Sequence, residues 1–145
     1  MSDRDERSLL NHLIEMCRDE ARALQFAAEH VQDAGVQATL KQLASDRGRF
    51  ADDLLRHAQR LGGADAHDGT TRGALHQQWL AFKHALVGSS ERTMIAEAAN
   101  VERQTLVGFE QALTDLLPPT ARDLVEQQCA QLRQGHQRVR SMLAQ

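Results

Sequence analysis

Hydrophobic residues recur along the chain at steps of three, four and seven residues, which is the spacing of an amphipathic helix. In residues 8–34 the repeating positions are Leu10, Leu13, Cys17, Leu24, Ala28 and Val31. In residues 36–61 they are Val36, Leu40, Leu43, Phe50, Leu54, Ala58 and Leu61. No alternation of period two reaches a useful length, so the pattern predicts helices and no sheet.

Three further stretches, residues 72–87, 91–117 and 119–144, show the same spacing. Their inward positions are predicted to be Leu75, Trp79, Phe82 and Leu86; then Ile95, Ala98, Leu106, Phe109, Leu113 and Leu116; then Val125, Cys129, Leu132, His136, Val139 and Leu143. We expect Ser8 to cap the first helix and Gly35 to end it in a left-handed conformation. The pair Pro118-Pro119 should separate the last two helices.

The lengths of the connections predict the arrangement of the helices. Very short connections join the first long helix to the second and the third to the fourth, so each pair should form an antiparallel hairpin. The second long helix, at about 1.5 Å per residue, is about 39 Å long. Residues 62–90 carry a short helix and can return over that distance, which leaves the second and third long helices parallel. The expected fold is one all-α domain over residues 1–145, a ferritin-like four-helix bundle with a long crossover that carries a short fifth helix.

Composition agrees with this fold and argues against several classes of function. Of 145 residues, 41% are hydrophobic and only 3% are aromatic, and strands favour aromatic residues. The net charge is −3 and acids and bases are interleaved, so we expect no nucleic-acid partner. No apolar run suits a membrane span, and the charged N-terminus lacks the apolar segment of a signal peptide. Cys17 and Cys129 lie within helical patterns, so we expect reduced thiols and a cytoplasmic protein.

Three charged residues interrupt the hydrophobic stripes. At 100° per residue, Glu20 lies about 40° from Leu24, and Arg47 and Glu102 lie near the centres of their own stripes. A shift of the first hairpin by 82 residues places Glu20 on Glu102 and Arg47 on Cys129, as in a hidden duplication. Because an unpaired buried charge costs several kcal/mol, these residues need partners.

One interpretation of these residues is a metal site. A di-iron carboxylate site takes one Glu from each of two helices and a Glu-x-x-His pair from each of the other two. Glu20 and Glu102 supply the single carboxylates, but Arg47 and Cys129 stand where the pairs would begin. His136 lies farther along the last helix. The candidate ligands are therefore Glu20, Glu102, Cys129 and His136, with iron or zinc as the metal.

The interpretation that we favour replaces the metal with an arginine. The guanidinium of Arg47 can bond two carboxylates and cannot lose its proton to escape burial. It also places a permanent positive charge where a cation would bind. We therefore expect a buried polar cluster of Glu20, Arg47 and Glu102, and no cofactor. The sequence holds no Ser–His–Asp set, phosphate-binding loop or Cys-x-x-Cys motif, so we favour a non-enzymatic protein.

Short motifs are spread over nearly the whole chain. They are Leu9–Glu15, Arg60–Gly63, Gly73–His76, Trp79, Lys83, Ala85-Leu86, Glu102, Leu117–Pro119 and His136–Arg140. Together they resemble a small bacterial family of ferritin-like four-helix-bundle proteins that is catalogued as a domain of unknown function. The resemblance implies the ferritin-like fold and an association with stress, and it supplies no established reaction. Iron-using relatives in the wider superfamily carry Glu-x-x-His pairs, from which this chain departs at both places.

Three functions remain open. The first is a ferritin-like bundle with a degenerate metal site, stress-associated and acting through its surface or assembly. The second is an iron- or zinc-binding oxidative-stress protein with an atypical carboxylate site. The third is a helical interaction module, whose partner would be a second copy or another protein. Phe26 bears on the third, because it points about 160° away from the first stripe. It would mark an interface unless the short helix covers it or it is a harmless lone exposed residue.

Overall fold

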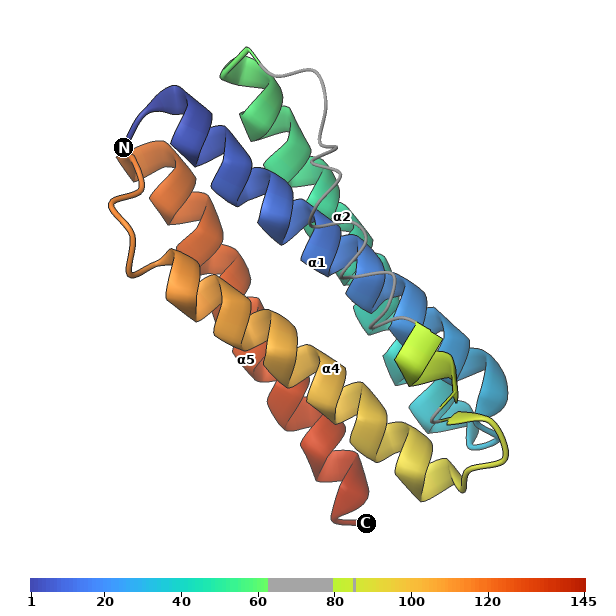
Figure 1. Cartoon of the computed structure of the whole chain (residues 1–145). Helices are drawn as coiled ribbons and strands as arrows, with labels where there is room; N and C mark the ends of the chain where they lie inside the picture. Colours follow the sequence, from blue (N-terminus) through green and yellow to red (C-terminus); the bar gives the residue numbers. More distant parts are fainter. Residues whose placement is uncertain (63–79, 85) are drawn as a thin grey trace.

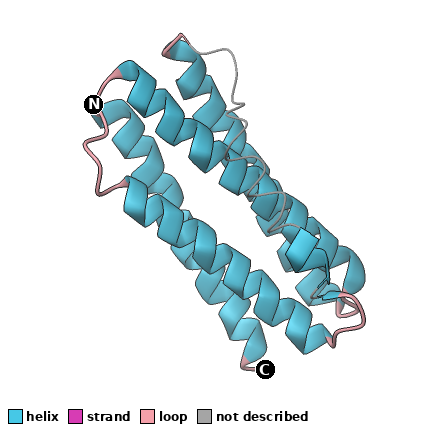
Figure 2. Cartoon of the chain, viewed as in Figure 1, coloured by secondary structure: helices cyan, strands magenta, loops and turns pink. Residues whose placement is uncertain are grey.

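The computed structural model describes residues 1–62, 80–84 and 86–145 of the chain (Figure 1). Its long helices are α1 (Asp3–His30), α2 (Ala34–Arg60), α4 (Glu91–Ala112) and α5 (Pro119–Leu143). Residues 80–84 and 86 add a short helical segment before α4. No strand occurs within the described ranges (Figure 2), which confirms the predicted all-α class.

The four long helices form two antiparallel hairpins that lie side by side. α1 pairs with α2, and α4 pairs with α5, while α1 also contacts α4 and α5 also contacts α2. Figure 1 shows α2 and α4 running in the same direction on opposite corners of the bundle. This parallel direction is the one predicted from the long connection between them.

The core consists of two apolar clusters, one toward each end of the bundle. The first joins the N-terminal half of α1 to the C-terminal half of α2, and includes Leu13, Phe50, Phe109 and Leu132. The second joins the other halves, and includes Leu24, Leu40, Ile95 and Val139. On every long helix, the residues of the two clusters are separated by a short interval at mid-height.

The ends of α1 differ from the predicted ones. Ser2, not Ser8, caps the helix, because its side chain accepts a hydrogen bond from the Asp5 backbone N–H at 3.1 Å. At the other end, Val31 is extended, with φ −90° and ψ 151°. Asp33 then caps α2, and Gly35 lies inside the first turn of α2, without a positive φ. The turn is made by an extended residue and a side-chain cap, so it needs no left-handed glycine.

The connection between α4 and α5 is also longer than predicted. α4 ends at Ala112, and residues 113–118 form tight turns in which the Thr114 and Asp115 N–H groups bond carbonyls only three residues back. Because these residues have left the α-helix, the helical spacing no longer determines which of them face inward. Leu116, predicted to be inward, is 84% exposed, and Leu117 is buried instead.

The short segment before α4 covers part of α1. Phe82 and Leu86 are buried in the second apolar cluster, as predicted, and Phe26 packs against the same cluster. The Lys83 ammonium lies 5.8 Å from the centre of the Phe26 ring. Phe26 is therefore half-buried, and its position gives no exposed interface. Leu75 and Trp79 lie outside the described residues.

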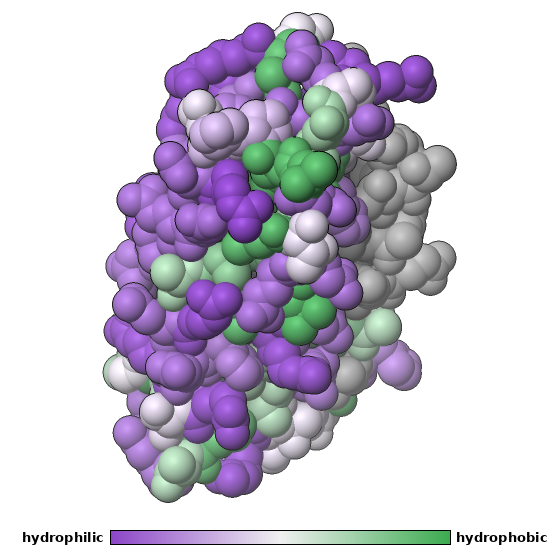
Figure 3. Space-filling model, turned by 90° about the vertical axis from the view of Figure 1, so that its left-hand side faces the viewer, coloured by the Kyte–Doolittle hydropathy of each residue, from purple (hydrophilic) through white to green (hydrophobic). Residues whose placement is uncertain are grey.

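The visible surface is mostly polar. Figure 3 shows one face of the molecule, on which hydrophobic residues are confined to a broken band along its length. Such a band is what remains visible when amphipathic helices pack their apolar stripes inward. Within the described ranges, we find no helix whose length and apolar character would suit a bilayer.

Candidate functional site

Besides Thr105 of α4, each long helix contributes one buried residue to the interval between the two apolar clusters. These residues are Glu20 on α1, Arg47 on α2, Glu102 on α4 and Gly135 on α5, and all four are buried. The three charged side chains, which we call the Glu–Arg–Glu cluster, are at most 1% exposed. The structure thus brings together the three residues that the stripes placed inward.

Arg47 bonds mainly to the carboxylate of the other hairpin. Its Nη2 donates to Glu102 Oε1 at 2.7 Å and its Nε donates to Glu102 Oε2 at 3.3 Å, in the two-pronged geometry that suits a guanidinium. Nε also lies 3.4 Å from Glu20 Oε2. One guanidinium therefore faces two carboxyl groups, and its single positive charge can balance only one ionised carboxylate.

Glu20 is the carboxyl that the surroundings favour as neutral. Burial raises its pKa most, and the charge of Glu102 and a hydrogen bond with Glu102 raise it further, while Arg47 and Thr105 lower it by less. As a carboxylate, Glu20 has no hydrogen-bond donor on either oxygen within the described structure. As an acid, its O–H can donate to Glu102. The pair then carries one negative charge against the one positive charge of Arg47.

The two glutamates also affect the pKa values of Arg47 and Cys17. Burial alone would lower the pKa of the Arg47 guanidinium, but Glu20 and Glu102 outweigh it and the pKa lies above its ordinary value. Burial raises the pKa of the Cys17 thiol well above its ordinary value, and Glu20 adds to the rise. Cys17 therefore stays a protonated thiol beside the cluster, which makes it a poor nucleophile.

We expect Glu20→Gln to remove a loss of stability that the parent shows as pH rises. A raised folded-state pKa stabilises the fold fully below the ordinary glutamate pKa, and this stabilisation is lost as pH rises toward the raised value. Glutamine copies the neutral acid and never ionises. In urea unfolding from about pH 4 to about pH 8, the free energy of unfolding of the variant should increase relative to that of the parent as pH rises. Parallel pH profiles of the two proteins would contradict the assignment of Glu20 as the neutral carboxyl.

Gly135 lets the ion pair approach the backbone of α5. A Cβ atom at this position would lie 2.5 Å from Arg47 Nη2 and 2.8 Å from Glu102 Oε1. Both distances are shorter than any real Cβ contact, and the atoms met are held by their own hydrogen bonds. Gly135 is not among the residues predicted from the helical pattern. A glycine inside a helix costs about 1 kcal/mol relative to alanine, so its presence there is a signal of close packing.

The other candidate ligands do not join the cluster. Cys129 is buried in the first apolar cluster, and the charges that act on its pKa, after burial raises it, are those of Arg133 and Glu110. His136 is half-buried, because Gly135 takes the inward place one residue earlier. Burial and Arg140 lower the pKa of His136, and the charge of Glu102 offsets this only in part. Among the described residues, no three His, Cys, Asp or Glu side chains are placed to hold a metal ion.

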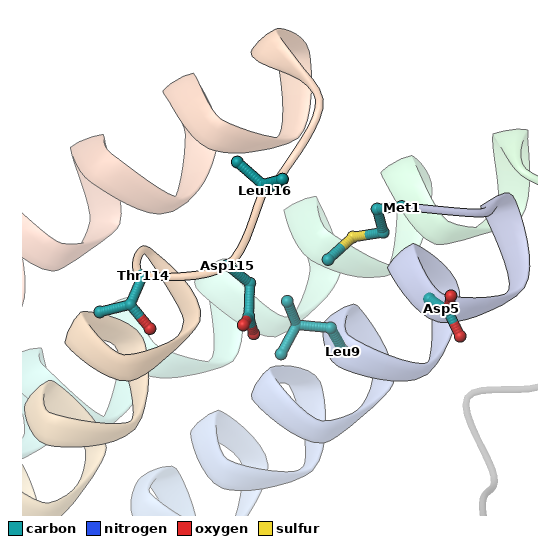
Figure 4. A pocket seen from close by; sticks show the side chains of 6 residues that line it. All are labelled: Met1, Asp5, Leu9, Thr114, Asp115 and Leu116. Atoms are coloured by element: carbon teal, nitrogen blue, oxygen red, sulfur yellow. The ribbon is translucent and has the colours of Figure 1, made fainter.

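A hollow lies at the end of the bundle where α1 begins. It has a volume of about 490 Å³ and is open to solvent. Figure 4 shows Leu9 of α1, Met1 just before α1 and Leu116 of the α4–α5 connection around it, with Thr114 and Asp115 beside them. Its lining has no grouped titratable residues beyond Asp5 and Asp115, so it offers no catalytic constellation.

Comparisons with known proteins agree with the fold. A structure of a mutant of Dps1 from Mycobacterium smegmatis matches with a TM-score of 0.82 and 14% sequence identity, covering 99% of each chain. At this identity the likeness shows the ferritin-like fold alone. No curated protein matches the sequence. The model of a family described as a domain of unknown function (DUF2383) matches residues 5–115. Because the match covers most of the 145 residues, the chain belongs to the DUF2383 family, a domain of unknown function.

Proposed function

We propose that this protein is a non-enzymatic ferritin-like bundle in which Arg47 takes the place of a metal ion. It would then act through its surface or its assembly, and not through oxidation chemistry at its centre. The observation that carries the proposal is the position of the Arg47 guanidinium, 2.7 Å from Glu102 and 3.4 Å from Glu20 in the middle of the bundle.

The chemistry of the cluster supports this proposal. A divalent cation between two carboxylates needs both of them ionised, whereas here burial favours the neutral form of Glu20. A guanidinium already balances Glu102, so an incoming cation would have to displace a permanent charge. Neither Cys129 nor His136 lies in the cluster to supply a third ligand.

Metal analysis of protein purified without an affinity tag or a chelator tests the proposal. We expect far less than one iron or zinc ion per chain. Near-stoichiometric iron or zinc would overturn the proposal and favour the alternative, a metal-binding oxidative-stress protein with an atypical carboxylate site.

A matched variant makes this test sharper. Arg47→Met leaves Glu20 and Glu102 facing each other without the guanidinium, and two carboxylates are a plausible oxygen-ligand pair for a divalent cation. In a titration with Zn²⁺, thermal stabilisation should be larger for Arg47→Met than for Arg49→Met, which removes an exposed arginine two residues away. Equal stabilisation of the two variants would show that Arg47 does not exclude cations.

A further inference from the structure

A cavity of about 240 Å³ opens between α2 and α5 and reaches the buried Arg47. A water molecule takes about 30 Å³ in the liquid, so the space can hold a group considerably larger than one water. Gly135 forms part of the wall, and Arg47 Nη2 packs closely against it, so the guanidinium lies at the floor of the cavity.

The α5 side of the cavity carries Gln131, Gln134 and Arg138 at helical spacing. Within the part of the chain that the structure describes, these three side chains make no hydrogen bond or ion pair. Asp46 stands on the α2 side, but it is already engaged, because it accepts hydrogen bonds from Gln42 at 3.0 Å and from Arg49. The wall therefore presents unused donors, and its one carboxylate is neutralised.

Arg47 adds donors at the floor of the cavity. Its Nε and Nη2 donate to Glu102, while Nη1 has no acceptor among the described residues. A guanidinium has five N–H donors. Arg47 is only 1% exposed but lines the cavity, and Nη1 is not among the buried polar atoms that lack a partner, so a group that enters the cavity can supply its acceptor.

We propose that this cavity binds a small oxyanion, of the class of inorganic phosphate or a short carboxylate, between Arg138 and the unbonded edge of Arg47. Guanidinium groups match phosphate and carboxylate oxygens in pairs. The carboxamides of Gln131 and Gln134 supply further donors to the same oxygens. Glu102 balances Arg47 and Arg49 balances Asp46, so Arg138 leaves the cavity with an excess of positive charge that favours an anion over a cation.

Calorimetric titration of the full chain with inorganic phosphate at constant ionic strength tests this site. Arg138→Gln should weaken binding by about tenfold or more, the loss expected for one charge-assisted pair. Arg140→Gln, an exposed arginine of the same helix that does not line the cavity, should keep the affinity of the parent within about twofold. In NMR spectra, phosphate should shift the side-chain amide signals of Gln131 and Gln134.

Two results would overturn the proposal: the same weakening in both variants, which would indicate general charge attraction, or no heat and no shifts in the parent. The titration contains no metal, so its outcome is independent of the metal content that tests the function proposed above.

Discussion

Arg47→Met should lower the free energy of unfolding by about 3–5 kcal/mol at neutral pH, the cost of removing one partner of a buried ion pair. The side chain is almost fully buried and pairs with Glu102 at 2.7 Å. Methionine fills much of the space but leaves a carboxylate without its counter-charge. Urea unfolding of the two proteins at neutral pH gives the difference.

The loss should shrink in acid, because a carboxylate left without Arg47 can be protonated there and the buried charge disappears. Arg49→Met is the control, since Arg49 is 62% exposed and pairs with Asp46 only at the surface. That variant should change the free energy of unfolding by no more than about 1 kcal/mol. A loss for Arg47→Met that stays the same from acid to neutral pH would mean that only packing was lost.

Gly135→Ala should lower the free energy of unfolding by about 3 kcal/mol, the upper end of the usual cost of overpacking a core. The added Cβ would lie 2.5 Å from Arg47 Nη2, which is already bonded to Glu102, and 3.2 Å from Leu43 Cδ2. The ion pair can yield only by lengthening its own hydrogen bonds. Thermal or urea unfolding measures this cost directly.

Gly48→Ala provides the matched comparison for this prediction. Gly48 also lies inside a long helix, but a Cβ there would meet no atom within 4 Å. Alanine is the better helix former by about 1 kcal/mol, so Gly48→Ala should raise stability by up to that amount. Two glycine-to-alanine changes of the same sign would contradict the close approach of α5 to the ion pair.

The helices could be predicted because their apolar stripes extend over many turns. The ends could not, since a few local hydrogen bonds decide them. Residues 3–7 carry no apolar stripe, yet the Ser2 cap and the acidic first turn start α1 there. At the C-terminal end of α4, the apolar spacing continues in the sequence through Leu116, but the helix itself ends at Ala112.

The inward positions of Glu20, Arg47 and Glu102 follow from the same long stripes, and the short first turn sets Glu20 and Arg47 at similar heights. The residue that α5 contributes to the site, Gly135, could not be predicted in this way. The 82-residue shift pointed to Cys129, but the side chain of Arg47 extends along the bundle to the level of Gly135. A glycine does not stand out in a pattern of hydrophobic and polar residues. Helical spacing also does not show how far along the bundle a long side chain such as that of Arg47 extends.

The Arg47–Glu102 pair joins α2 to α4, and these helices belong to different hairpins. Apolar stripes of Leu and Ala tolerate a slide of one hairpin along the other by one helical turn, about 5.4 Å. Such a slide would separate the buried charges.

A variant with Glu20→Leu, Arg47→Met and Glu102→Leu should be about as stable as the parent, because apolar replacements of whole buried ion clusters commonly are. We expect it to give more than one set of backbone NMR signals, and a single set would contradict this role. We therefore expect the cluster to specify a single packing of the two hairpins while contributing little to the free energy of folding.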